Sequence, residues 1–210
     1  MGERRMGQSK GGNPLFAAVY DTIMRPLEAW SVRGQRRRIG DAARGRVLEI
    51  GAGTGAMLGY YTPAVTEVVA TEVDPHMLKR AGDKAAGARV PVVLREADAQ
   101  RLPFGDSEFD TAVVALSLCT IPDARAALAE TRRVLRDDGQ LLFVEHVRSL
   151  RPGVARVQDA VTPVWKRIAG GCHLNRDTVG AVEAAGFRLE NLWRSGKRRG
   201  SIIQGRAVPR

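Results

Sequence analysis

The 210-residue sequence has only two cysteines, Cys119 and Cys172, and it lacks a long hydrophobic run. Two cysteines are too few for a disulfide framework or a four-ligand zinc site, so we expect no structural disulfide and no metal. No apolar stretch approaches the roughly 20 residues that span a bilayer, and no signal-peptide pattern opens the chain. These absences predict a cytoplasmic protein with reduced thiols.

Acidic residues are fewer than basic ones, which gives a formal net charge of +10 at pH 7. The excess lies at the ends: residues 1–46 hold ten Lys/Arg against four Asp/Glu, and residues 186–210 hold seven against one. The middle of the chain is close to neutral. Basic ends favour contact with an anionic surface, either phospholipid headgroups or nucleic acid, although solvated arginines are the simpler interpretation.

Glycines interrupt an apolar run at residues 47–55, Val-Leu-Glu-Ile-Gly-Ala-Gly-Thr-Gly. The run predicts a buried strand over 47–50, a tight turn, and a helix that begins at about Ala56. Glycine has no Cβ, so the turn can be sharp and its backbone can approach a ligand, while the free N–H groups of the helix point to the same place. A nucleotide-like ligand is therefore expected. The spacing Gly51-x-Gly53-x-x-Ala56 also satisfies the relaxed dinucleotide fingerprint, which alone is weak evidence.

An acidic residue follows the second predicted strand, which covers residues 67–71. Glu72 lies about 20 residues beyond the glycine turn, the distance at which an acidic residue meets a ribose. Its carboxylate can accept hydrogen bonds from both ribose hydroxyls. Asp74 is the alternative, but Asp74-Pro75 is more typical of a helix cap and first helical position. Met77 would then pack on adenine or in the core.

Strands and helices alternate along the rest of the chain, which predicts a parallel sheet covered on both faces. The third, fourth and fifth strands are predicted at residues 90–95, 109–115 and 141–147. A turn is predicted at 137–139, and a helix capped by Asp123 precedes it. The C-terminal third should hold a partly helical stretch over 152–171, a loop at 170–175, a helix capped by Asn175, and strands at 187–193 and 201–208.

Four segments together resemble the class I methyltransferases that use S-adenosylmethionine (SAM), of the ubiquinone/menaquinone-biosynthesis type. They are the string from Glu49 to Gly55, then Glu72, then Asp98 followed by Leu102-Pro-Phe104, and Arg133-Val-Leu-Arg-x-x-Gly139. The resemblance covers nearly the whole chain and implies an α/β fold: a doubly wound, mostly parallel seven-stranded sheet with a C-terminal antiparallel hairpin. It also implies that SAM, not NAD, is the cofactor, since Asp98 would accept a hydrogen bond from the adenine amino group.

The same resemblance implies which residues contact SAM. They are Glu49, Gly51, Ala52, Gly53, Thr54, Gly55, Glu72, Val73, Met77, Asp98, Ala99, Ala115 and Leu116.

Three further strings resemble the small-thiol S-methyltransferases within that superfamily. They are Leu118-Cys-Thr-Ile, Phe143-Val-Glu-His-Val147 and the string over residues 171–178. This resemblance implies a small thiol as acceptor, with His146 or His173 as a base, although a hydrogen-bonding residue of a loop or strand end is the simpler interpretation of either histidine. Substrate contacts are expected from Tyr20, Leu118, Cys119 and Trp165.

Other acceptors stay open. Phospholipid N-methyltransferases share the loop motifs, so phosphatidylethanolamine is an alternative acceptor, as is a quinone or phenol. The basic ends would suit a peripheral contact with a membrane surface. A non-enzymatic alternative is a basic nucleic-acid-binding protein, although we expect no specific nucleic acid.

The length fits one domain. We expect residues 1–45 to form an N-terminal tail and lid helices across the cofactor mouth, with Tyr20 and Asp21 facing the substrate or Tyr20 packed against the core. Residues 46–210 should form the SAM-binding methyltransferase domain, in which segment 148–176 faces a small-molecule substrate.

Overall fold

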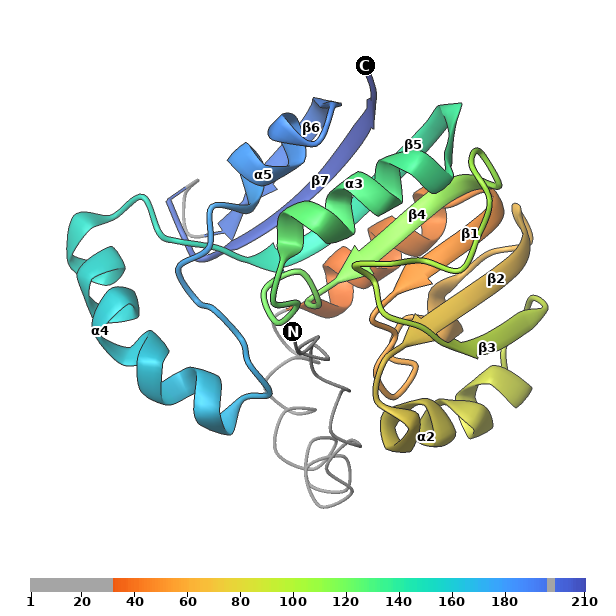
Figure 1. Ribbon diagram of the computed structural model, residues 1–210, viewed down its shortest axis with the longest axis horizontal. Coiled ribbons are helices and arrows are strands. Elements are labelled where there is room, and N and C mark those ends of the chain that lie inside the picture. The colour runs from red at the N-terminus through yellow and green to blue at the C-terminus, as the bar shows by residue number, and fades with distance from the viewer. Residues whose placement is uncertain (1–31, 196–198) are drawn as a thin grey trace, which may run out of the picture.

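The computed structural model describes residues 32–195 and 199–210. Within them, seven strands form one sheet in the order β3-β2-β1-β4-β5-β7-β6 (Figure 1). The strands are β1 (Gly45–Ile50), β2 (Val65–Glu72), β3 (Val92–Glu96), β4 (Phe109–Ala115), β5 (Leu135–His146), β6 (Phe187–Arg194) and β7 (Ile202–Pro209). Strands β1 to β5 run parallel, and β7 is antiparallel to both β5 and β6. The predicted doubly wound sheet with an antiparallel end is confirmed.

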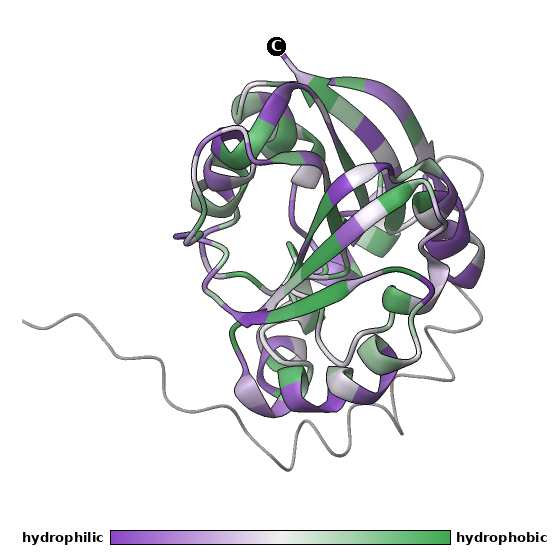
Figure 2. Ribbon diagram, turned by 90° about the vertical axis from the view of Figure 1, so that its right-hand side faces the viewer, coloured by the Kyte–Doolittle hydropathy of each residue, from purple (hydrophilic) through white to green (hydrophobic). Residues whose placement is uncertain are grey.

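Helices cover both faces of the sheet. On one face lie α3 (Ala124–Val134) and α5 (Thr178–Ala184), which appear together in Figure 1. On the other lie the helical residues 32–42, the 3₁₀ turn η1 (Leu58–Tyr60) and α2 (Pro75–Ala86). Because successive side chains of a strand point to opposite faces, Leu48 joins the first core and Val47 the second. Figure 2 shows the result: largely hydrophobic central strands inside helices that also carry hydrophilic residues.

Two of the three predicted helix caps are confirmed. Asp74 accepts backbone hydrogen bonds from residues 76 and 77 and opens α2, with a proline in its first turn. Asp123 caps α3 in the same way. The third prediction is wrong: Asp177, not Asn175, caps α5, because the Asn175 amide donates instead to Asp159 at 3.0 Å.

Two other local predictions are wrong. No α-helix begins at Ala56, where only η1 forms and Leu58 is fully buried. Closely spaced Gly55 and Gly59 and the proline at 63 disfavour a longer helix there. Residues 137–139 do not end an element but lie inside β5, whose pairing with β4 jumps from Phe109↔Leu135 to Thr111↔Gln140. The predicted turn is therefore an irregularity within a strand.

The N-terminal lid is only partly described. Residues 32–42 are helical, and Val32 and Ile39 are buried in the core beside Tyr61 and Leu142. This part of residues 1–45 therefore packs on the sheet. Tyr20 and Asp21 lie outside the described residues, so their contact with substrate stays a prediction.

The longest of the described helices, α4 (Pro152–Ile168), lies to one side of the sheet (Figure 1). Only Ala155, Gln158 and Thr162 of this helix are buried. Among the described helices, none is long and apolar enough to cross a membrane.

Candidate functional site

A cavity of about 630 Å³ opens at the carboxyl ends of β1, β2, β4 and β5. In open α/β sheets this edge is where ligands bind, and the volume is in the range of ligand sites. Eight of the thirteen residues expected to contact SAM line it: Gly51, Gly53, Glu72, Val73, Met77, Asp98, Ala99 and Leu116.

The glycines of the loop after β1 have different surroundings. Gly51, Gly53 and Gly55 all have positive φ angles, of 67°, 57° and 76°. A Cβ on Gly51 would lie 2.5 Å from the Ser117 Cβ, whereas a Cβ on Gly53 would meet no heavy atom within 4 Å. Gly51 therefore allows two loops to pack closely, and Gly53 leaves its backbone open to the cavity.

Glu72 ties the glycine loop to the end of β2. Its Oε2 accepts a hydrogen bond from the Gly53 N–H at 2.9 Å. Its Oε1 accepts from the N–H groups of Val73 and Asp74 at 2.8 and 3.0 Å. A carboxylate has about four acceptor positions, so Glu72 keeps capacity for a ligand hydroxyl on the cavity side. Asp74, the alternative residue, also lines the cavity, but its carboxylate caps α2.

Asp98 lies in the loop after β3 and is paired with Gln100. The backbone N–H and the side-chain amide of Gln100 both donate to Asp98 Oδ1 at 2.9 Å. The Gln100 carbonyl oxygen in turn accepts from the Asp123 N–H at 3.1 Å. Gln100 lines the cavity and was not singled out from the sequence, where only its place two residues after an aspartate hinted at this turn.

Five predicted cofactor residues do not line the cavity: Glu49, Ala52, Thr54, Gly55 and Ala115. Glu49 lies beneath the loop, where its Oε2 accepts a hydrogen bond from the Tyr61 hydroxyl at 2.9 Å. Burial raises the pKa of Glu49 to about 7 and, together with the adjacent carboxylate, raises that of Tyr61. In this structure Glu49 therefore supports the loop from below.

A buried carboxylate shapes the turn after β4. The N–H groups of Ser117, Leu118 and Cys119 donate to Glu145 at 2.9, 2.9 and 3.1 Å. Burial raises the pKa of Glu145 to about 7, against the opposite effect of these three hydrogen bonds. Leu116, just before the turn, has a φ of 60°, which is uncommon for a residue with a side chain. Leu118 points into the core and away from the cavity.

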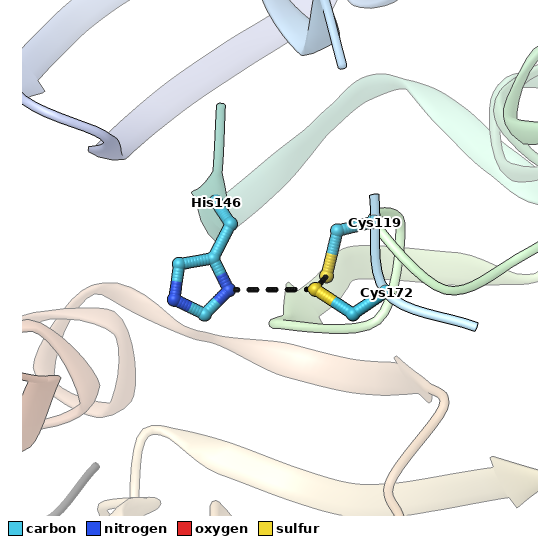
Figure 3. A group of neighbouring side chains, drawn as sticks. All are labelled: Cys119, His146 and Cys172. Atoms are coloured by element: carbon cyan, nitrogen blue, oxygen red, sulfur yellow. Dashed lines mark hydrogen bonds between the residues drawn. The ribbon is translucent and has the colours of Figure 1, made fainter. Parts of the chain in front are cut away.

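Cys119, His146 and Cys172 meet at the cavity wall (Figure 3). The two sulfur atoms lie 3.5 Å apart, and the Cys172 sulfur lies 4.0 Å from His146 Nδ1. The hydrogen bond between the two thiols lowers the pKa of Cys172 to about 5, and His146 acts in the same direction. The pairing with Cys172, with burial, raises the pKa of Cys119. Cys172 is thus the more acidic thiol and faces the histidine.

The two candidate catalytic histidines are placed differently. His146 lines the cavity at the end of β5. His173 does not: its Nδ1 lies 3.1 Å from the Cys119 carbonyl oxygen and 3.4 Å from the Arg176 guanidinium. Trp165 lines the cavity from α4, together with Arg167, which sequence reasoning missed because nothing distinguishes it from other arginines.

Comparison with known proteins identifies the family. A "Methyltransferase domain" family model matches residues 48–143. The chain is 35% identical over 154 residues to "Thiol S-methyltransferase TMT1B" of Homo sapiens, covering 70% of this chain and 62% of that protein. It is 31% identical over 155 residues to "Phosphatidylethanolamine N-methyltransferase" of Cereibacter sphaeroides, covering 67% and 76%. The chain thus spans less than two thirds of the human relative's length.

A solved structure shows the same fold. The "DhpI-SAH complex structure" matches with a TM-score of 0.68 at 18% identity, over 93% of this chain and 92% of that chain. The cavity itself also suits an adenosine cofactor: Glu72 has spare acceptor capacity, and the space in front of Gly53 is open. The chain belongs to the class I S-adenosylmethionine-dependent methyltransferases, and its cofactor is SAM.

Proposed function

We propose that this protein transfers the methyl group of SAM to the sulfur of a small thiol. The observation that carries the proposal is the wall formed by Cys119, His146, Cys172 and Trp165. It shares one cavity with Glu72 and Asp98, the two carboxylates suited to hold the cofactor. The relatives named as thiol S-methyltransferases support the same acceptor.

The cofactor end of the site is assigned residue by residue. Glu72 accepts hydrogen bonds from the ribose hydroxyls, and Asp98 accepts one from the adenine amino group after yielding part of its contact with Gln100. The open backbone at Gly53 receives the amino-acid end of the cofactor. Met77 packs against adenine.

The acceptor end has to align a sulfur atom behind the methyl carbon and exclude water. SAM supplies a methyl group on a sulfonium, which is its own leaving group. The aliphatic side chains of Leu116 and Ile121 and the aromatic ring of Trp165 give this part of the cavity an apolar surface that suits a small soft nucleophile. A free thiol has a pKa of about 8.5, so a useful fraction is ionised near neutrality. His146 is placed to accept the remaining thiol proton.

A panel of small thiols, phenols and amines with SAM tests the proposal by release of S-adenosylhomocysteine. We expect hydrophobic thiols to be the best acceptors and the rate to rise with pH as thiolate forms. Asp98→Ala should weaken SAM about tenfold or more, because a charge-assisted hydrogen bond is lost. Methylation of phenols or amines in preference to every thiol would refute the thiol assignment.

A second acceptor, phosphatidylethanolamine, is favoured by one surface feature. Val157, Val164 and Ile168 of α4 are 60%, 60% and 66% exposed, and they continue a row with Val154 and Val161. The spacing of three and four residues places them on one face of the helix, where they could contact lipid chains. Phosphatidylethanolamine vesicles belong in the same panel. If the vesicles are methylated and the thiols are not, the lipid assignment replaces the thiol one.

A further inference from the structure

Three potential metal-ligand atoms, two sulfurs and one imidazole nitrogen, converge at the cavity wall from separate parts of the chain. Cys119 comes from the turn after β4, His146 from the end of β5, and Cys172 from the loop after α4. One ligand atom from each side chain lies within 4.8 Å of the other two. Among the described residues, no other His, Cys, Asp and Glu side chains form such a group.

The separations are close to those around a tetrahedral zinc ion. With Zn–S and Zn–N bonds of about 2.3 and 2.1 Å, two ligand sulfurs lie ~3.8 Å apart and a sulfur and a nitrogen ~3.6 Å apart. The sulfurs here are 3.5 Å apart, and the Cys172 sulfur is 4.0 Å from His146 Nδ1. The third pair, Cys119 and His146, lies within 4.8 Å, so the imidazole has to move on the order of 1 Å toward the two sulfurs to complete the geometry.

We propose that Cys119, His146 and Cys172 bind one zinc ion whose fourth position faces the cavity and takes the acceptor thiol. The metal site rests on the geometry alone; the acceptor as its fourth ligand rests on the proposed function. Three protein ligands and one open position are the arrangement of catalytic zinc, whereas structural zinc has four protein ligands. Thiolate and imidazole together select zinc over magnesium or calcium.

Hydrogen bonds from adjacent segments of this protein hold the three ligand residues in place before a metal binds. The N–H of Cys119 donates to Glu145, and its carbonyl oxygen accepts from the N–H of His173, at 3.1 and 2.8 Å. The second bond joins the two cysteine loops directly. His146 is paired with Ile202 in the sheet. Preorganised ligands lose little freedom on binding.

Charge balance favours the ion over bare thiolates. Cys119 and Cys172 are only 1% and 6% exposed, and burying an uncompensated charge is costly. Two thiolates, a neutral imidazole and Zn²⁺ sum to zero. The ion therefore removes the cost of ionising both thiols beside the apolar wall.

The reaction balances without an oxidant or reductant. With His146 bound to the metal, the ion takes the place of that histidine as the group that promotes ionisation of the acceptor. The acceptor thiol displaces a zinc-bound water, gives its proton to that water or to solvent, and stays on zinc as a thiolate. A sulfur lone pair then forms the bond to the methyl carbon, while the methyl–sulfonium bond breaks and its electron pair returns to the donor sulfur. The product thioether is neutral and a weak zinc ligand, so water replaces it.

Metal content of untagged protein tests the site. After reconstitution with Zn²⁺ and gel filtration, we expect one zinc per chain by mass spectrometry. Cys119→Ser, Cys172→Ser and His146→Asn should each lose most of it, whereas His173→Asn, on the same loop but outside the cavity, should keep it. Circular dichroism checks that each variant is folded. Metal-free folded wild type, a Cys119–Cys172 disulfide in place of zinc, or zinc retained by all variants would overturn the site.

Cobalt substitution tests the fourth ligand. Co²⁺ in this site should show thiolate-to-cobalt charge-transfer absorption, and adding an acceptor thiol that the protein methylates, in the absence of SAM, should intensify it. An unchanged spectrum would refute coordination of the acceptor even if zinc is bound. Thiol methylation that survives complete removal of zinc would refute the role of the metal and leave the proposed function standing. Zinc binding without methylation of any thiol would refute the proposed function and leave the metal site.

Discussion

Gly51 and Gly53 have nearly the same backbone conformation, and what surrounds each differs. Alanine at either position adopts a left-handed conformation at a cost of about 1–2 kcal/mol. At Gly51 the new Cβ also lies 2.5 Å from the Ser117 side chain, so a loop must move. At Gly53 it meets open space within the cavity. The first glycine therefore allows two loops to pack closely, and the second leaves its backbone open to the cavity.

We therefore predict that one alanine variant mainly loses stability and that the other mainly loses affinity for SAM. Gly51→Ala should lose more unfolding free energy in urea than Gly53→Ala. Gly53→Ala should fold but bind SAM at least about tenfold more weakly in calorimetric titration, because its methyl group occupies ligand space. Equal stability of the two variants, or undiminished SAM affinity of Gly53→Ala, would contradict this division of roles.

Glu49 gives a pH-dependent term in stability. Its pKa is about 7 in the folded protein against an ordinary value of 4.5, mainly because it is buried. The folded state then binds more protons than the unfolded state between these values, so stability falls as pH rises through that window. The full difference corresponds to about 3 kcal/mol. This loss of unfolding free energy is absent below about pH 4.5 and complete above about pH 7.

Glu49→Gln should remove this term. Relative to wild type, the variant should gain about 2–3 kcal/mol of unfolding free energy on going from pH 5 to pH 8. Urea denaturation of both proteins at the two pH values measures it, and the comparison cancels Glu145, which titrates in both. If the difference in unfolding free energy between the variant and wild type does not change with pH, then burial does not raise the pKa of Glu49 and the prediction is wrong.

At the scale of elements, a buried glutamine of α4 joins this helix to the chain on either side of it. Gln158 accepts from the Ser149 N–H at 2.8 Å and donates to the carbonyl oxygens of Val147 and Leu174 at 3.0 and 2.7 Å. These bonds join the helix to the chain before and after it. The same helix carries Trp165 to the cavity wall.

Gln158→Ala should loosen that wall. Leaving buried backbone groups without partners costs about 1–3 kcal/mol each, so unfolding free energy should fall, and KM for the acceptor should rise. SAM affinity should change little, since Glu72 and Asp98 lie on other elements. Val161→Ala, on the exposed side of α4, is the control and should stay within about 0.5 kcal/mol of wild type. A fall in SAM affinity as large as the rise in KM would contradict the assignment.

The elements that were predicted correctly have strong local signals. The Asp74-Pro75 pair and the apolar strands at 47–50 and 109–115 are each decided by a few adjacent residues. The predictions were wrong where two nearby residues could each cap the same helix, as at Asn175 and Asp177. They were also wrong where strand pairing continues through a predicted turn, as at residues 137–139. Propensity does not resolve such cases, because the winning contact comes from a distant segment.

For the residues of the site, too, some positions were predictable from the sequence and others were not. Glu72, Asp98 and His146 follow parallel strands, and the carboxyl ends of such strands share one edge of the sheet, so their convergence was predictable. The meeting of Cys119 with Cys172 was not. These two residues are 53 positions apart, and their contact depends on how α4 turns the chain back. A count of cysteines excluded a four-ligand metal site and gave no sign of a three-ligand one.

At the scale of the whole molecule, the positive charge is partly neutralised. Arg188 and Arg206 both contact Glu190, at 3.2 and 3.4 Å. Arg194 donates to the carbonyl oxygens of Arg148 and Gly200 at 3.1 and 3.0 Å. Several arginines of the basic segment 186–210 therefore already have partners within the protein.

We accordingly predict only weak binding to nucleic acid. Affinity for labelled RNA or DNA should fall steeply with salt and vanish near about 150 mM, as for non-specific phosphate contacts. Fluorescence anisotropy over a salt series measures this. Sequence- or structure-selective binding at that salt would instead favour a nucleic acid as substrate or ligand.

The order of strands has a consequence for synthesis. β7 pairs with both β5 and β6, yet it follows β6 in the sequence. While the ribosome makes the chain, β1 to β5 can assemble early, but β6 has no strand to pair with until β7 has emerged and inserted between β5 and β6. His146 pairs with Ile202 of β7, so one wall of the cavity takes its final form only then. The nascent protein can thus complete the Gly51 and Glu72 side of the cavity first and the His146 side last.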